Sequence, residues 1–383
     1  MKISIVISSR NEFPNIVHTC HSIWNSLESD GFKPEDSEII LVDNNSDDSD
    51  PVRTATNGTS DFLICRGAFA NRRLKVLYDP IAGNVTARNK GAEIAKGEYL
   101  FFSDSHMSYG PGTFKRLMQT IDECGGIVHP AVAWMGSYPP SKGMGYSLKA
   151  GETGIKGTWN NLIVGKGDDW FYVPGMGHCC LGMKRELFQK MKGYPTHLRC
   201  YGGGELYGSA LSYLLGYCTV TEPRVNVYHL SAGRGYSYQN ADYIHNVFLS
   251  CLILGADDWA ERGYLNNLRK GNPETLNKLW KQAEAECQEQ KEFVKKNKIM
   301  TFNEMLERRP WDEMNMKKHG TTNSGLLVFH PTWIEECKTA PEYMKEAYRN
   351  SKHQKELEKF IVDKLWNFVY HNNKYDKGNL PKI

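Results

Sequence analysis

The sequence lacks any long hydrophobic run. No apolar stretch approaches the ~18 residues that a transmembrane helix needs. The N-terminus, MKISIVISSRNE, becomes polar too soon to be a secretory signal peptide. From these two absences we expect a soluble, cytoplasmic protein without integral membrane association.

Two further absences concern cysteine spacing and charge. The ten cysteines are scattered, with one adjacent pair, Cys179-Cys180, and no CxxC spacing. This pattern predicts reduced thiols and argues against a disulfide framework or a zinc module. The formal net charge is only +3 over 383 residues, which indicates neither a strongly basic nucleic-acid binder nor an acidic tail.

Strand-like and helix-like patterns alternate through the first half of the chain. Hydrophobic residues make up 40% of the sequence and aromatic residues 11%, which is enough for a packed core. Apolar runs predict strands at residues 2–8, 38–42, 74–77 and 99–102, and helical spacing predicts helices at 16–27, 83–95 and 114–121. This alternation is typical of βαβ units, so we expect an α/β fold with a mostly parallel sheet.

The rest of the chain is less regular. Residues 136–170 are rich in Gly, Lys and Tyr, and we interpret them as a long insertion or lid. A short helix is predicted near 186–191, a longer one at 206–214, and a strand at 218–227. Beyond that point the pattern becomes helical, with one charged amphipathic helix at 276–294 and another at 357–368. We therefore predict two regions, 1–240 and 241–383, the second of them helical.

Two of the predicted strands end in polar clusters. The strand at 99–102 is followed by Asp104-Ser105-His106, and the strand at 38–42 by Asp43. In extended backbone Asp104 and His106 lie on one face, where both could bind a divalent ion such as Mn²⁺ or Mg²⁺. Ligands of open α/β sheets gather at the carboxyl ends of strands. The alternative for both clusters is ordinary turn chemistry, with Asp104 capping the next helix.

Seven short motifs in this order resemble the GT-A glycosyltransferases of family 2. Several of them resemble the polypeptide N-acetylgalactosaminyltransferases in particular. Each motif alone is weak, but together they cover about the first 235 residues. The motifs are IVISSRNE at 5–12, VDNNSDD at 42–48, ARNKGA at 87–92, LFFSDSH at 100–106, PGM at 174–176, GGGE at 202–205 and VYH at 227–229. The resemblance implies a Rossmann-like GT-A sheet with helices on both faces.

The resemblance also implies roles for individual residues. Asp104 and His106 match a DxH form of the family's metal-binding DxD motif, and His229 matches the histidine that completes the metal site. The other residues it assigns to the nucleotide-sugar are Ser9, Arg10, Glu12, Asp43, Arg88, Gly203 and Gly204.

Glu205 is the candidate catalytic carboxylate. Inverting relatives carry a Glu-Asp pair at this place, in which a carboxylate deprotonates the acceptor hydroxyl. This chain has Glu205-Leu206, closer to the retaining N-acetylgalactosaminyltransferases, where the Glu binds the donor sugar. A carboxylate favoured by the helix dipole is the structural alternative. His178 and Cys179-Cys180 stand where these relatives have small residues, which leaves the sugar open.

The predicted function is metal-dependent transfer of a sugar from a nucleotide-sugar, with UDP expected, to a hydroxyl acceptor. The acceptor could be a glycan, a small molecule or DNA with hydroxymethylated bases. Basic residues interleaved with Phe293, Phe302 and Trp311 offer some support for nucleic acid, although nearby glutamates favour a solvated helix face. A nucleotidyltransferase would carry a Gly-rich loop after the first strand, which is missing. A non-catalytic sugar- or nucleic-acid-binding module on the same fold is the remaining alternative.

Overall fold

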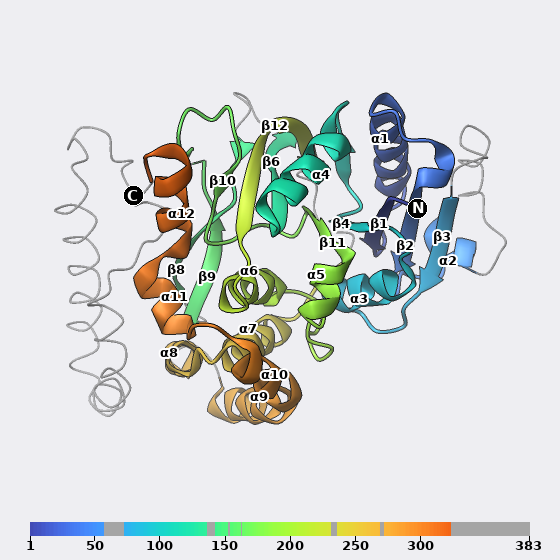
Figure 1. Cartoon of the computed structure of the whole chain (residues 1–383). Coiled ribbons are helices and arrows are strands. Elements are labelled where there is room, and N and C mark those ends of the chain that lie inside the picture. Colours follow the sequence, from blue (N-terminus) through green and yellow to red (C-terminus); the bar gives the residue numbers. More distant parts are fainter. Residues whose placement is uncertain are drawn as a thin grey trace, which may run out of the picture.

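The structure is a computed structural model of the chain (Figure 1). It describes residues 1–56, 73–135, 142–151, 154–161, 163–230, 236–268 and 272–322. The helix predicted at 357–368 lies outside these residues. Among the described helices, none has both the length and the apolar character needed to cross a membrane.

A single mixed sheet organises the molecule. In the described residues it has ten strands, ordered β10-β12-β6-β11-β4-β1-β2-β3, with β5 paired to β12 and β7 to β6. The pairs β1–β2, β1–β4, β2–β3 and β12–β6 are parallel, as the βαβ pattern predicts. The strands are β1 (Ile3–Ser9), β2 (Ser37–Asp43), β3 (Arg73–Tyr78), β4 (Tyr99–Ser103), β5 (Met107–Tyr109), β6 (Ile127–Met135), β7 (Lys142–Gly143), β10 (Phe171–Tyr172), β11 (Cys180–Lys184) and β12 (Thr219–Leu230).

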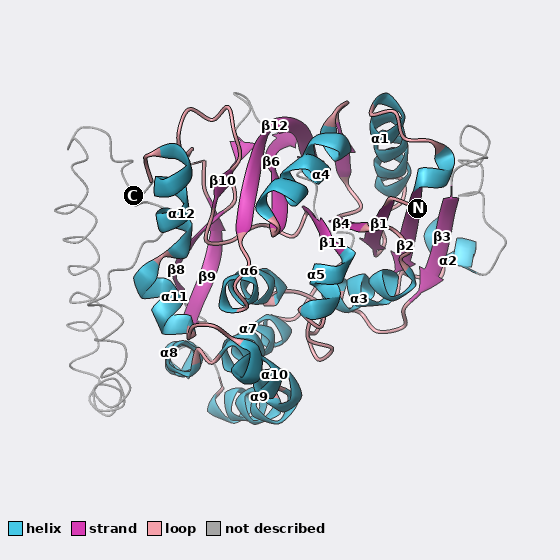
Figure 2. Cartoon of the chain, viewed as in Figure 1, coloured by secondary structure: helices cyan, strands magenta, loops and turns pink. Residues whose placement is uncertain are grey.

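Helices cover both faces of this sheet (Figure 2). Successive side chains of a strand point to opposite faces, and in β4 the ring of Phe101 contacts Phe114 of α4 while that of Phe102 contacts Phe188 of α5. The predicted GT-A arrangement of a mostly parallel sheet between helices is confirmed. The helices of this part are α1 (Asn15–Ser29), η1 (Pro34–Asp36), α2 (Pro51–Thr56), α3 (Asn84–Ile94), α4 (Thr113–Cys124), α5 (Arg185–Lys190) and α6 (Gly204–Leu214).

The parallel register brings the ends of three strands to one edge of the sheet. Ser9 of β1 lies opposite Asp43 of β2, and Ile7 lies opposite Ser103, the last residue of β4. β11 runs antiparallel to β4, with Cys180 opposite Ser103. The polar residues that follow β1, β2 and β4 and precede β11 therefore meet at this edge.

The segment 136–170 is more regular than predicted. Its described residues contain a β-hairpin of β8 (Tyr146–Gly151) and β9 (Gly154–Trp159). Glycines interrupt the alternation of apolar and polar side chains by which a strand is identified, because they leave room for aromatic rings and have no side chains of their own. A Cβ at Gly157 would lie 2.1 Å from the ring of Tyr146. The interpretation of this stretch as an unpatterned insertion was wrong.

The helical part after residue 240 packs closely beneath α6 (Figure 1). α7 is almost wholly buried, and its core residues belong to the same hydrophobic cluster as the sheet. The single helix predicted at 276–294 is two helices, because the helix is interrupted at Cys287. The division at residue 240 stays a prediction. The helices are α7 (Asn240–Leu254), α8 (Asp257–Leu268), α9 (Pro273–Glu286), α10 (Gln288–Asn297), α11 (Phe302–Arg308) and α12 (Pro310–His319).

Candidate functional site

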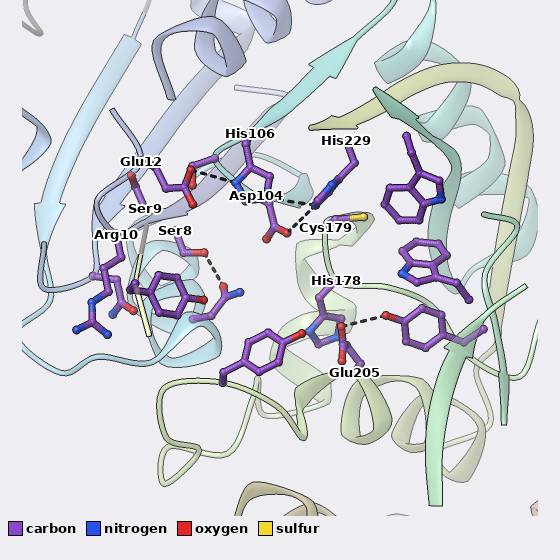
Figure 3. A pocket seen from close by; sticks show the side chains of 18 residues that line it. Ser8, Ser9, Arg10, Glu12, Asp104, His106, His178, Cys179, Glu205 and His229 are labelled. Carbon is purple, nitrogen blue, oxygen red and sulfur yellow. Dashed lines mark hydrogen bonds and ion pairs between the residues drawn. The ribbon is translucent and has the colours of Figure 1, made fainter. Parts of the chain in front are cut away.

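A cavity of about 310 Å³ lies at the edge of the sheet where β1 and β4 end (Figure 3). Ser8, Ser9, Arg10 and Glu12 line one side of it, and the chain that follows β4 lines another. The hairpin β8–β9 and the start of α6 contribute the remaining walls. A polar cavity at the carboxyl ends of parallel strands is the expected place for a ligand in an open α/β sheet.

Asp104, His106 and His229 converge in this cavity. Their ligand atoms all lie within 4.8 Å of one another. The Nε2 atoms of His106 and His229 are 3.2 Å apart, and His229 Nε2 lies 3.9 Å from Asp104 Oδ2. His229 stands on β12, opposite Met107 of β5, so strand pairing joins two segments that are distant in the sequence.

A turn, and not an extended strand, brings Asp104 and His106 together. β4 ends at Ser103, and the next strand starts only at Met107. Thr19 of α1 fixes the turn, because its hydroxyl contacts the carbonyl of Ser105 and the backbone N–H of Met107. The prediction that the two side chains share a site therefore agrees with the geometry, but the extended-backbone argument for it was wrong.

The donor set fits a divalent ion. Two nitrogens bound to one ion at about 2.1 Å lie about 3.0 Å apart in octahedral and about 3.4 Å apart in tetrahedral geometry. The observed 3.2 Å between the two histidines is compatible with either. The other ring nitrogen of His106, Nδ1, lies 3.1 Å from Glu12 Oε2, the carboxylate contact that commonly orients a metal-binding histidine. His229 Nδ1 has no such partner within the described part of the chain.

Arg88 supplies a fixed positive charge beside this group. Its side chain is completely buried, and Nη2 donates to Asp104 Oδ1 at 2.9 Å while Nε donates to Asn84 Oδ1 at 3.1 Å. Burial by itself would raise the pKa of Asp104, but the hydrogen bond with His229 and the charge of Arg88 outweigh it and hold that pKa well below its usual range. Asp104 is therefore a carboxylate, the form that binds a cation.

Comparison with known proteins fits this geometry. Residues 4–191, just under half of the chain, match the family model described as "Glycosyl transferase family 2". Residues 4–191 are therefore similar to a glycosyltransferase family 2 domain. Glu205 and His229 lie beyond the matched residues, so they join the site only through the fold.

Individual relatives agree with this family. The chain is 26% identical over 243 residues to a protein named "Probable N-acetylgalactosaminyltransferase 9" from Caenorhabditis elegans, covering 61% of this chain and 40% of that protein. A solved structure of GalNAc-T7 with UDP, GalNAc and Mn²⁺ matches 77% of this chain and 57% of its own at 18% identity, with a TM-score of 0.56. This likeness shows the shared GT-A fold. The chain spans less than two thirds of either relative.

A second solved structure is a more distant match. The solved structure of S. aureus TarS 1-349 in complex with UDP-GlcNAc has a TM-score of 0.49 and 14% identity, with 92% of each chain covered.

Glu205 stands in the first turn of α6, at the wall of the cavity. The hydroxyl of Tyr146 donates to its Oε1 at 3.1 Å. The chain before it, from Arg199 to Gly203, passes so close to α7 that a Cβ at Gly203 would lie 2.6 Å from the carbonyl oxygen of Asn246. Gly202 and Gly203 also have φ angles of 97° and 80°, which favour glycine.

Asn246 of α7 binds this chain segment directly. Its Oδ1 accepts from the N–H of Arg199 at 2.8 Å, and its Nδ2 donates to the carbonyls of Arg199 and Tyr201 at 3.0 Å and of Gly202 at 3.3 Å. The side chain of Asn246 is completely buried. Sequence reasoning missed it, although an Asn next to the apolar stretch 247–254 was a usable signal. The segment 199–202 and Asn246 are called the Asn246 clamp below.

Other predicted residues lie behind the cavity wall. Asp43 is fully buried, its Oδ1 accepts from the N–H of Ser46 at 3.0 Å, and it does not line the cavity. Its neighbour Asn44 does. Gly203 and Gly204 are buried at the start of α6 and are absent from the cavity lining.

His178 and Cys179 form a neutral wall of the cavity. Burial lowers the pKa of His178 well below its ordinary value and raises the pKa of Cys179 well above it. Burial also raises the pKa of Cys180 to about 12. The imidazole therefore stays uncharged and the thiols stay protonated near neutral pH, so these side chains shape the cavity rather than carry charge.

Most of the basic and aromatic stretch near the C-terminus is not arranged to stack bases, although Phe293 is partly exposed. Phe302 and Trp311 are completely buried. Lys291 is bound to Asp257, and Lys318 to Asp169. α11 and α12 pack these two rings into the hydrophobic core.

Proposed function

We propose that this protein is a metal-dependent glycosyltransferase that moves a sugar from a nucleotide-sugar, with UDP as the nucleotide, to a hydroxyl acceptor. The observation that carries the proposal is the convergence of Asp104, His106 and His229 beside the buried Arg88. The similarity to family 2 and the N-acetylgalactosaminyltransferase relatives support it. A cytoplasmic location without integral membrane association belongs to the same proposal.

Asp104, His106 and His229 would hold Mn²⁺ or Mg²⁺. The ion would supply positive charge to the diphosphate of the leaving nucleotide. Support for Mn²⁺ and UDP comes from the GalNAc-T7 structure, which contains both. Glu12 orients His106, so we assign it to the ion rather than to the nucleoside. Arg88 keeps Asp104 ionised and in place.

The donor would lie along the end of β1 and reach towards α6. Ser9 and Arg10 line the side of the cavity assigned to the nucleoside. Asp43 orders the turn that presents Asn44, so we propose a positioning role for it in place of direct contact with the base. Gly203 lets the chain approach α7 closely, and Gly204 leaves room for Val85 and His178, so both help to place Glu205.

Glu205 is proposed to bind the donor sugar through its carboxylate. Tyr146 donates a hydrogen bond to Oε1 of this carboxylate, which lines the cavity and can accept from a sugar hydroxyl. The neutral His178 and Cys179 bound the same space. These groups position the anomeric carbon and exclude water from it.

A nucleotide-sugar hydrolysis screen tests the proposal. The protein would be incubated with Mn²⁺ and each of several UDP-sugars, and released UDP would be measured. We expect slow UDP release from at least one donor, loss of it with EDTA, and loss of the Mn²⁺ enhancement of UDP binding in Asp104→Ala. Binding without any release of UDP would favour a non-catalytic module. UDP binding that is indifferent to metal would overturn the metal assignment.

A further inference from the structure

Three aromatic rings form a corner on one wall of the cavity. Trp134 of β6 and Trp159 of β9 meet edge to face, with ring centroids 5.1 Å apart and planes at 89°. Trp159 meets Tyr146 of β8 in the same way, at 4.9 Å and 81°. All three line the cavity, and both indoles are partly exposed. We call Trp134, Trp159 and Tyr146 the aromatic corner.

Glycines hold the corner in place. A Cβ at Gly143 would lie 2.4 Å from Cε3 of Trp159, and one at Gly177 would lie 2.3 Å from Cζ2 of the same ring. A Cβ at Gly157 would overlap the ring of Tyr146. The indole of Trp159 is therefore fixed between backbone segments while part of it still faces the cavity. A rigid, partly exposed aromatic surface costs little conformational entropy when a ligand packs on it.

The aromatic corner contacts both the candidate metal-binding group and the carboxylate of Glu205. Trp134 meets the ring of His229 at 5.2 Å and 82°, while Tyr146 donates to Glu205. Figure 3 shows His229 and Glu205 across the cavity from Ser9 and Arg10, where the nucleoside is proposed to bind. A molecule packed on the corner would thus lie beside the donor sugar and away from the nucleoside, the place an acceptor must occupy.

The shape and charge of this wall discriminate between acceptor classes. A flat base held by stacking needs parallel aromatic faces, whereas these rings stand almost at right angles. A polyanion needs basic neighbours, but among the described residues that line the cavity the acidic Glu12, Asp104 and Glu205 face one basic side chain, Arg10. A pyranose fits better, because it offers an apolar C–H face and edge to the rings and hydroxyls to the carboxylate.

We propose that the acceptor is a neutral carbohydrate whose pyranose ring packs in the aromatic corner. This inference rests on the proposed function and adds the acceptor class to it. In the transfer, the acceptor oxygen bonds to the anomeric carbon, and its proton passes to the departing diphosphate. The bond from that carbon to the diphosphate oxygen breaks, and its electron pair leaves with the nucleoside diphosphate. No redox partner is required.

An acceptor screen with matched variants tests the inference. The donor found by hydrolysis would be offered with Mn²⁺ and three panels: neutral p-nitrophenyl hexopyranosides of both anomers, Ser/Thr peptides, and duplex DNA containing 5-hydroxymethylcytosine. We expect transfer to a pyranoside. Trp159→Ala should raise the KM for that pyranoside about 10-fold or more, a larger effect than on the KM for the donor. Trp159→Phe should recover part of the loss, because it keeps a ring in the corner.

Trp280→Ala is the control for loss of an indole. Trp280 is partly buried against Phe248 and Tyr264, away from the cavity, so its removal should leave the acceptor KM unchanged. Transfer to peptide or DNA but to no pyranoside would overturn the inference, as would donor hydrolysis with no transfer to any panel. An unchanged KM in Trp159→Ala would do the same. Failure of the proposed function has a different signature, namely no UDP release and no metal-dependent UDP binding.

Discussion

Replacing Asn246 by Ala should damage recognition of the donor sugar, although Asn246 itself does not line the cavity. The Asn246 clamp is the main described link between α7 and the chain that leads into Glu205. The substitution removes one acceptor and two donor groups that hold Arg199, Tyr201 and Gly202. We expect the start of α6 to shift, and the carboxylate of Glu205 to shift with it.

The size of the effect on stability follows from the hydrogen bonds. Asn246 is completely buried, so its loss leaves one N–H and three carbonyls without their partner. Each unsatisfied buried group costs about 1–3 kcal/mol, and a water entering the vacated space recovers part of this. We therefore expect the free energy of unfolding to fall by about 3 kcal/mol.

Calorimetry separates the effect on binding from the effect on stability. With Mn²⁺ present, the affinity of Asn246→Ala for UDP should stay within about 2-fold of the original, because Asp104, His106 and His229 are not touched. Its affinity for the UDP-sugar should fall towards that for UDP, and the rate of donor hydrolysis should fall about 10- to 100-fold. Urea unfolding measures the accompanying loss of stability.

Asn315→Ala is a closely matched control. Asn315 of α12 is also completely buried, and it holds the N–H and carbonyl of Tyr172, both at 2.8 Å, in another part of the fold. The Asn315→Ala variant should have a lower free energy of unfolding, but it should still bind the UDP-sugar more tightly than UDP. If Asn246→Ala behaves like this control, with sugar binding intact, the clamp has only a structural role and the reasoning is refuted.

Three further predictions concern other groups. Glu12→Gln should weaken Mn²⁺ binding about 10- to 100-fold in a metal titration, because it loosens the contact that orients His106; unchanged affinity would contradict this. Burial lowers the pKa of His129 from 6.5 to about 3. Below about pH 6.5, therefore, this histidine binds a proton in the unfolded chain and not in the folded chain. Stability should fall from about pH 6.5 downwards by up to about 1.4 kcal/mol per pH unit from this group, and urea unfolding of His129→Met should show a smaller loss between about pH 7 and about pH 5. Cys179 and Cys180 should resist iodoacetamide near neutral pH, because burial raises both thiol pKa values; rapid labelling of the folded protein, detected by mass spectrometry, would count against that assignment.

The α/β architecture could be predicted because its signal is local. β1, β2 and β4 are largely apolar runs buried along their whole length, and helical spacing is recognisable after β1 and after the region of β4. The hairpin at Tyr146–Trp159 was not predicted, because its glycines make room for groups outside their own strand, namely the ring of Tyr146 on the paired strand and the carbonyl of Trp259. Periodicity within the segment carries no trace of those contacts.

The break at Cys287 illustrates a second limit. Apolar residues keep helical spacing across 276–294, so the sequence pattern predicts one helix. The two helices α9 and α10 both pack on α7, and the change of direction between them depends on that contact. Similarly, Phe302 and Trp311 are aromatic in a basic stretch, and only the packing of α11 and α12 puts them inside.

For the site, the sequence by itself determined the ligand types and their local order: an apolar strand, then Asp104 and His106, with His229 and Glu205 at later motifs. The tertiary structure decided which of these side chains meet. The turn fixed by Thr19 and the pairing of β5 with β12 bring the three ligands together, while Asp43 turns away from the cavity. Asn246 and the aromatic corner were assigned only through the fold. The physical reason is that short-range pattern sets the backbone state of a segment, whereas a site is built from long-range contacts, and no segment encodes its distant partners by itself.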